Sequence, residues 1–188
     1  MTLTPPKTAL QYLGPVRNIL NGPGYSRRVG NEIVPLIDPN LIIAIVWQES
    51  AGVPWAYRPE PRYRWLWDVK ADKPFRKVSD QEIESENAPE DFCCLTGSRN
   101  QEWWAQQASW GLMQIMGACA REQNFKGPYL TELCDPYVNL EFGIKHLWQY
   151  AFQHGGRSQT DALLRWNGGN PDYPGQVLEK MKAVAASL

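Results

Sequence analysis

The chain has 188 residues, enough for one domain with a sizeable core, and its formal net charge is −1. Without a basic excess it cannot neutralise many phosphates, which argues against nucleic acid as the main partner. Its apolar runs are too short to span a bilayer, and its first residues lack the basic and apolar regions of a secretory signal. We therefore expect one domain (1–188), monomeric and without a membrane span.

The expected elements are mostly helices, so the expected fold class is mainly α. Asp38 before Pro39 is a favourable helix start, Ser79 with Glu82 matches a capping box, and residues 1–35 are expected to form an N-terminal helical extension. Hydrophobic spacing, glycines and prolines then divide the chain. The expected helices lie at 7–20 with a break near Gly14-Pro15, and at 39–50, 79–87, 111–123, 136–153, 158–166 and 174–187, with a loop at 21–24.

Glu49 stands out because it lies near the end of the apolar helix 39–50, at helical spacing from Ile42, Ile45 and Val46. This spacing puts the carboxyl group on the side that faces the core. Burial and the negative end of the helix dipole both disfavour the charged form, so we expect a raised pKa. Such a group can serve as a general acid near neutral pH. The alternative is that Glu49 lies past the buried stretch and points into water.

Four segments, in this order along the chain, resemble the lytic transglycosylase domain of the lysozyme-like superfamily. They are Glu49-Ser50, Gly111-Leu112-Met113-Gln114, Asn139 with Gly143, and Trp166-Asn167, which stands where the family usually has Tyr-Asn. The resemblance covers residues 36–182. It implies a lysozyme-like helical domain, like goose-type lysozyme, with a long irregular insertion (52–108) between the Glu49 helix and the Gly-Leu-Met-Gln motif.

The resemblance also implies an activity: cleavage of the β-1,4 bond between N-acetylmuramic acid and N-acetylglucosamine in peptidoglycan. Glu49 would act alone as acid and base, leaving 1,6-anhydromuramoyl ends without a cofactor. In the family a tyrosine hydroxyl at position 166 helps hold the catalytic carboxyl group, whereas the indole of Trp166 can donate a hydrogen bond but cannot accept one. The implied substrate-binding residues are Ser50, Ser109, Met113, Gln114, Trp166 and Asn167.

The same resemblance places the protein at the bacterial cell wall. A compact wall-cleaving domain of this kind resembles a phage lysis or virion-associated enzyme, and equally a domain of a larger secreted or periplasmic protein. The partner is then the peptidoglycan glycan strand.

The segment 52–108 is rich in aromatic residues and arginine, and its prolines prevent long elements. Long loops on a rigid scaffold often carry function, so one interpretation is a wall of the saccharide groove with Tyr57 and Trp65 as stacking residues. The other is a loop that tucks its aromatic side chains into a separate hydrophobic cluster.

Two alternative functions stay open at this stage. A hydrolytic muramidase would add a second carboxylate at a short distance from Glu49, and Glu60, Asp68, Asp91 and Glu102 are candidates. A non-catalytic glycan-binding protein on the same fold would need neither carboxylate.

The cysteines and histidines give no metal-site pattern. Adjacent Cys93 and Cys94 can hardly pair with each other. Two states stay open: all four cysteines reduced and buried, or one bridge from Cys93 or Cys94 to Cys119 or Cys134 in an oxidising compartment. His146 and His154 are eight residues apart, so we expect structural or exposed histidines and no metal.

Overall fold

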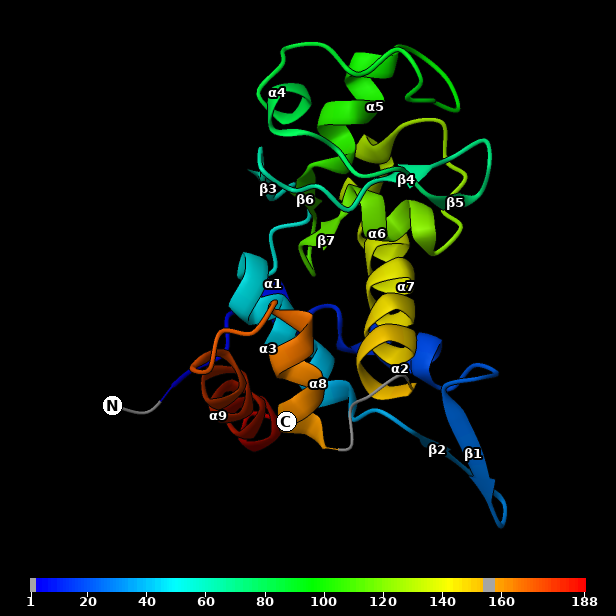
Figure 1. Ribbon diagram of the computed structural model, residues 1–188. Coiled ribbons are helices and arrows are strands. Elements are labelled where there is room, and N and C mark those ends of the chain that lie inside the picture. Colours follow the sequence, from blue (N-terminus) through cyan, green and yellow to red (C-terminus); the bar gives the residue numbers. More distant parts are fainter. Residues whose placement is uncertain (1–2, 154–157) are drawn as a thin grey trace. The chain divides into compact units, whose positions relative to one another are not determined.

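The computed structural model describes residues 3–153 and 158–188. Helices dominate these residues and the sheets are small, which confirms the predicted mainly α class (Figure 1). In these two ranges, none of the helices combines the length and hydrophobicity needed to cross a membrane. The chain forms two compact units, Met1–Val53 with Ile144–Leu188, and Pro54–Gly143.

The first unit is mainly helical and is centred on α3 (Pro39–Ser50), which has the predicted bounds. The Asp38 carboxylate caps α3 by accepting a hydrogen bond from the Asn40 backbone N–H at 2.8 Å. All residues from Leu41 to Val46 are buried. The other helices of this unit are α1 (Lys7–Leu10), α2 (Leu13–Leu20), η2 (Leu147–Gln153), α8 (Gln159–Trp166) and α9 (Tyr173–Ala186). Three of them, α1, α2 and α9, pack against α3, while α8 packs against η2 and α9.

The C-terminal end of α3 rests on the N-terminal segment of the chain. Ala51 takes the left-handed conformation (φ 52°), and its carbonyl oxygen accepts a hydrogen bond from the Thr8 hydroxyl group at 2.6 Å. A Cβ atom at Gly52 would lie 2.3 Å from the Thr8 backbone, so only glycine permits this approach. The end of α3 is therefore fixed by residues more than forty positions earlier in the sequence.

The N-terminal segment differs from the prediction in two respects. The break between α1 and α2 lies at Gln11 and Tyr12, before Gly14-Pro15. Pro15 sits instead in the first turn of α2, where its missing N–H removes no helical hydrogen bond. The same segment also contains an antiparallel hairpin that the sequence did not predict, formed by β1 (Ser26–Val29) and β2 (Glu32–Pro35) after α2 in the chain.

The second unit contains a three-stranded antiparallel sheet of order β3-β6-β7 and a small β4–β5 hairpin. Its elements are β3 (Tyr57–Pro59), β4 (Trp67–Asp68), β5 (Lys73–Pro74), α4 (Asp80–Ile83), α5 (Arg99–Gln106), β6 (Ala108–Trp110), β7 (Ile115–Met116), α6 (Gly117–Glu122), η1 (Leu130–Cys134) and all but the last three residues of α7 (Pro136–His146). One hydrophobic cluster lies largely within the insertion and comprises Leu66, Val78, Ile83, Ala88, Phe92, Trp103 and Ala118. The other comprises Ala108, Trp110, Ile115, Ala120, Phe125, Leu130 and Leu133.

The predicted helix at 111–123 is wrong in its first half. Gly111–Gln114 forms the turn between β6 and β7, and α6 begins only at Gly117. The reason is local: Gly111 and Gln114 have φ values of 67° and 49°, which an α-helix cannot accommodate.

The remaining helices follow the predictions with smaller changes. The capping box of Ser79 and Glu82 is present, although α4 is shorter than the predicted 79–87. The predicted helix 136–153 is continuous, but after His146 it winds as the π-helix η2. Ser158 caps α8, and Pro174 lies in the first turn of α9.

Candidate active site

Glu49 lies in the last turn of α3 and is half-buried. Its Oε1 atom accepts a hydrogen bond of 2.5 Å from the hydroxyl group of Tyr173, the first residue of α9. Tyr173 itself is almost fully buried, with 2% of its surface exposed. The carboxyl group therefore contacts the packed interface between α3 and α9 rather than standing free at the surface.

A second hydrogen bond extends this contact. The indole N–H of Trp166, at the end of α8, donates to the Tyr173 hydroxyl oxygen. Burial, the charge of Glu49 and the hydrogen bond to Glu49 together raise the pKa of Tyr173 well above its usual range. Tyr173 therefore keeps its proton and acts as the donor to Glu49. The order of the contacts is Trp166, Tyr173, Glu49.

Tyr173 is the site residue that the sequence analysis missed. The family resemblance directed attention to position 166 as the place of the carboxyl-holding hydroxyl group. In this chain a hydroxyl group that contacts Glu49 comes from position 173, and Trp166 contacts that hydroxyl group. The one local signal was a tyrosine directly before Pro174 at a helix start, which says nothing about the pairing of α9 with α3.

A cation lies near the same carboxyl group. The ammonium group of Lys180 donates a hydrogen bond to Gln48 Oε1 and lies 5.3 Å from the centre of the Trp47 ring. Burial lowers the pKa of Lys180, and the charge of Glu49 opposes that shift. The interaction is mutual, so the ammonium group favours the charged form of Glu49.

Ser50 and Asn167, the two neighbours named with Glu49 and Trp166, lie at helix ends. The Ser50 hydroxyl group donates to the Val46 carbonyl oxygen at 3.1 Å and accepts from the Gly52 N–H at 3.2 Å. Asn167 is the exposed C-cap of α8. These contacts explain how the chain turns at each helix end. The substrate roles of Ser50 and Asn167 stay predictions.

In the second unit, Asn139 holds the Gly111–Gln114 turn. Its buried Oδ1 accepts from the Met113 N–H at 2.8 Å, and its Nδ2 donates to the carbonyl oxygens of Trp110 and Leu133 at 2.8 and 2.9 Å. A Cβ atom at Gly111 would lie 2.3 Å from this amide group. The amide therefore fills the space that a larger residue at position 111 would need.

The other turn residues differ in exposure. Gln114 is half-buried, and its Nε2 donates to the carbonyl oxygens of Ala56 and Gly111 at 3.1 and 3.0 Å. Met113 is fully buried, and a Cβ atom at Gly143 would come within 2.6 Å of its sulfur. Ser109 is also buried and donates to the sulfur of Met116 at 3.3 Å. The contacts described for these three residues are all made within the protein. Their substrate roles stay predictions.

The aromatic residues of the insertion divide between a buried cluster and the surface, and the stacking roles of Tyr57 and Trp65 stay predictions. Phe92 and Trp103 belong to the buried cluster of the insertion. Trp65 is 76% exposed and meets Tyr63 edge to face at 5.6 Å. Tyr57 is about half exposed and packs against Trp110 at 4.7 Å. The insertion thus contains a core of its own and also presents aromatic rings to solvent.

Each of the four candidate second carboxylates already has partners. Glu60 pairs with Arg58 at 2.6 Å, and Asp68 accepts two backbone N–H bonds at 3.0 Å. Asp91 pairs with Arg76, which lowers the pKa of Asp91. The buried Glu102 forms a bidentate pair with Arg121 at 2.8 and 2.9 Å, which places that carboxylate in the interior. Each of these four carboxylates is thus already in an ion pair or a backbone hydrogen bond within the protein.

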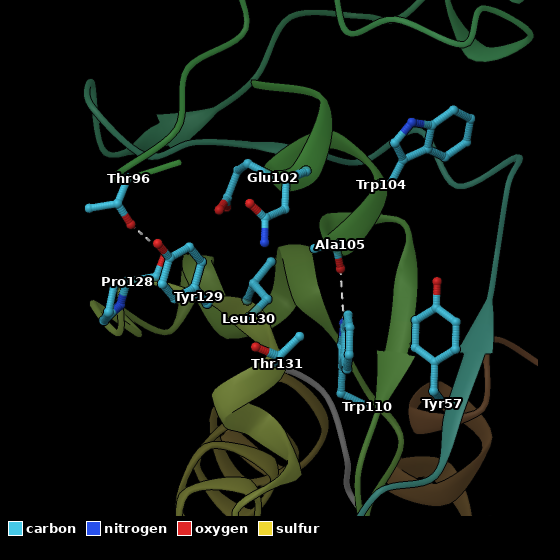
Figure 2. A pocket seen from close by; sticks show the side chains of 11 residues that line it. Tyr57, Thr96, Glu102, Trp104, Ala105, Trp110, Pro128, Tyr129, Leu130 and Thr131 are labelled. Carbon is cyan, nitrogen blue, oxygen red and sulfur yellow. Dashed lines mark hydrogen bonds between the residues drawn. The ribbon is translucent and has the colours of Figure 1, made fainter. Parts of the chain in front are cut away.

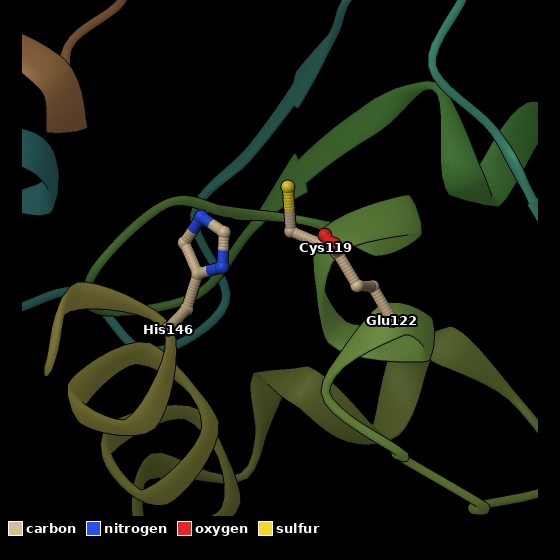
Figure 3. A group of neighbouring side chains, drawn as sticks. All are labelled: Cys119, Glu122 and His146. Atoms are coloured by element: carbon tan, nitrogen blue, oxygen red, sulfur yellow. The ribbon is translucent and has the colours of Figure 1, made fainter. Parts of the chain in front are cut away.

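All four cysteines are free thiols. Figure 3 shows Cys119 and Glu122 on α6 and His146 at the end of α7. Burial raises the pKa of Cys119 to about 11 and also raises that of Glu122, while burial lowers the pKa of His146 to about 4. His154 lies outside the described residues.

The family model described as "Transglycosylase SLT domain" matches residues 34–182. No curated protein and no solved structure matches the chain significantly.

Proposed function

Because the chain belongs to the SLT transglycosylase domain family, whose fold is lysozyme-like and whose members act on peptidoglycan of the cell wall, we propose that it is a lytic transglycosylase with Glu49 as its only acid/base. The bond cleaved is the β-1,4 linkage between N-acetylmuramic acid and N-acetylglucosamine. The residue assignment rests on one observation: the half-buried carboxyl group of Glu49 accepts a hydrogen bond from the Tyr173 hydroxyl group.

In the first step, the protonated Glu49 gives its proton to the glycosidic oxygen while the bond from this oxygen to muramoyl C1 breaks. In the second, the Glu49 carboxylate takes the proton of the muramoyl C6 hydroxyl group, whose oxygen bonds to C1. The 1,6-anhydro ring closes, no water is consumed, and Glu49 regains its proton. No cofactor enters either step.

Tyr173 has a positioning role in this proposal. Its hydrogen bond occupies Oε1 of Glu49 and fixes the plane of the carboxyl group, so that the other oxygen keeps one direction through both proton transfers. The indole of Trp166 fixes the Tyr173 hydroxyl group in turn. The tyrosine hydroxyl group that the family resemblance implied at position 166 is thereby supplied from α9.

The four candidate second carboxylates of the insertion already have partners within the protein, which favours a lyase over a hydrolase. A hydrolytic muramidase needs a second carboxylate to activate water or to attack the sugar. Glu102 is buried with Arg121, and Glu60, Asp68 and Asp91 have partners of their own.

Mass spectrometry of digested cell walls tests the proposal. We expect muropeptides with 1,6-anhydromuramoyl ends, and their complete loss with Glu49→Gln. Reducing ends, heavier by one water, would identify a hydrolase instead. Cell walls cleared equally well by the Glu49→Gln protein would rule out both enzymatic functions as written.

A further inference from the structure

A cavity of about 190 Å³ lies within the second unit, walled by aromatic rings from four separate segments (Figure 2). Tyr57 comes from β3, Trp104 from α5, Trp110 from β6 and Tyr129 from the loop before η1. More than half of its lining residues lie in the insertion 52–108. The insertion thus builds a concave surface in addition to its own core.

Hydrogen bonds within the protein fix the walls of this pocket. The indole N–H of Trp110 donates to the Ala105 carbonyl oxygen at 2.9 Å, so the polar edge of this mostly buried ring is already bonded within the protein. Thr96 donates to the Pro128 carbonyl oxygen at 2.8 Å and holds the loop that carries Tyr129. Figure 2 shows the rings of Trp110 and Tyr57 side by side at one wall, with Tyr129 across from them. The pocket is therefore formed before any ligand arrives.

The charge of the lining limits the ligand. Among the lining residues, all of which the structure describes, Glu102 is the one charged side chain. Its carboxylate is bound by Arg121 and by the Gln106 amide, so it offers no unpaired charge to a ligand. Hydroxyl and amide groups, such as those of Thr131 and Gln101, supply the other polar atoms. The lining thus suits a neutral ligand and has no cation for a carboxylate.

The size of the cavity limits the ligand further. Pockets for drug-sized molecules have roughly 300–1,000 Å³, so this one holds about a single ring. A sugar ring combines apolar faces, which stack on indole and phenol rings, with hydroxyl groups at its edge. A stem-free muramoyl ring carries a lactyl carboxylate, and a substituted one carries a peptide stem with acidic residues, so neither suits a neutral, ring-sized pocket.

We propose that this pocket is a glycan subsite that binds one N-acetylglucosamine residue. The inference rests on the proposed function for the choice of glycan, and on the aromatic, neutral, ring-sized lining for the choice of residue. It assigns a role to Tyr57 and adds Trp104, Trp110 and Tyr129 as further binding residues.

The test uses the full chain with Glu49→Gln, which prevents turnover, and tri-N-acetylchitotriose as the probe. Two-dimensional NMR of the tryptophan indole N–H groups, assigned by single substitutions, reports where the sugar binds. We expect the signals of Trp104 and Trp110 to move on titration. Trp104→Ala should weaken the binding seen at Trp110 by about tenfold or more, because tryptophan and tyrosine are enriched among the few contact residues that dominate binding and tenfold equals about 1.4 kcal/mol.

Trp55→Ala is the matched control, since Trp55 belongs to the same insertion, is 73% exposed and does not line the pocket. It should leave the binding curve at Trp110 unchanged. Trp104→Phe, which keeps a ring, should restore part of the affinity and guards against a folding defect in Trp104→Ala.

The inference fails if chitotriose moves neither the Trp104 nor the Trp110 signal, or if an acidic stem peptide moves them and chitotriose does not. The result of this binding test is independent of the result of the test for lyase activity. Anhydromuramoyl products from the wild-type protein with no sugar at this pocket would overturn the subsite alone. Sugar binding here by a protein without lyase activity would overturn the reaction alone.

Discussion

The unit that carries Glu49 and the unit that carries Gly111–Gln114 hold their motifs in different ways. Glu49 is held through side chains, by the Tyr173 hydroxyl group with Trp166 behind it. The Gly111–Gln114 turn is held through its backbone, by one buried amide that makes three hydrogen bonds. When a residue changes, a side chain at another position can replace a side-chain contact. The hydrogen bonds from one buried amide to the backbone of a turn cannot be replaced in this way.

This difference explains why one motif departs from the family pattern and the other does not. At position 166 an indole replaces the expected phenol, and the hydroxyl group that contacts Glu49 comes from α9. At position 111 any side chain would collide with Asn139, and at position 143 with Met113. Substitutions of Gly111, Asn139 or Gly143 should therefore damage folding, and substitutions around Glu49 should damage turnover.

The largest effect on stability is expected for Asn139→Leu. It removes three hydrogen bonds and leaves the Met113 N–H and two carbonyl oxygens buried without their partner, at about 3–5 kcal/mol in the free energy of unfolding. Urea denaturation measures this loss. Asn18→Leu, on the exposed side of α2, should change stability by less than about 0.5 kcal/mol. Equal losses of stability in the two proteins would contradict the role of Asn139 in holding the Gly111–Gln114 turn.

Gly143→Ala should cost about 1–3 kcal/mol, because the new methyl group would lie 2.6 Å from the sulfur and 3.0 Å from the Cβ atom of the buried Met113. Gly175→Ala is the matched control, since a Cβ atom there meets nothing within 4 Å in α9 and no proline follows it. That substitution should be neutral or raise the melting temperature. A stabilised Gly143→Ala protein would show that Met113 moves aside freely.

Tyr173→Phe should lower kcat by about 10–100-fold, as expected for the loss of one hydrogen bond to a charged group. Its KM should change little, because the contact is made to Glu49 and not to the sugar. Steady-state kinetics on a soluble glycan fragment separates the two parameters.

The double variant Tyr173→Phe with Trp166→Phe sharpens this test. If Trp166 acts only through the Tyr173 hydroxyl group, Trp166→Phe alone has a smaller effect, and adding it to Tyr173→Phe lowers kcat no further. Additive losses in kcat would mean that Trp166 contributes independently.

The smallest effect is expected for Lys180→Met. The ammonium group favours the charged form of Glu49, so its removal should let the acid form persist to higher pH. We expect the alkaline limb of the pH–activity profile to move to higher pH. Lys182→Met, an exposed neighbour on α9, should leave the profile unchanged. A downward shift for Lys180→Met would contradict the sign of this interaction.

The sequence predicted what depends on local chemistry. The bounds of α3 follow from Asp38, Pro39 and the apolar run after them, and the capping box at Ser79 is equally local. The sequence could not predict the turn at Gly111–Gln114, because its left-handed residues are set by Asn139, twenty-six positions away from Met113. The contact between Tyr173 and Glu49 spans 124 positions, and no periodicity reports such a pairing.

The contact between the N-terminal segment and the end of α3 limits how far the chain can be shortened. The family match begins at residue 34, but Thr8 hydrogen-bonds to Ala51 and packs so closely on Gly52 that no methyl group fits between them. Trimming the chain to the matched region would uncap the very turn of α3 that presents Glu49. A shortened version intended for engineering should therefore retain α1, even though that helix lies outside the recognised domain.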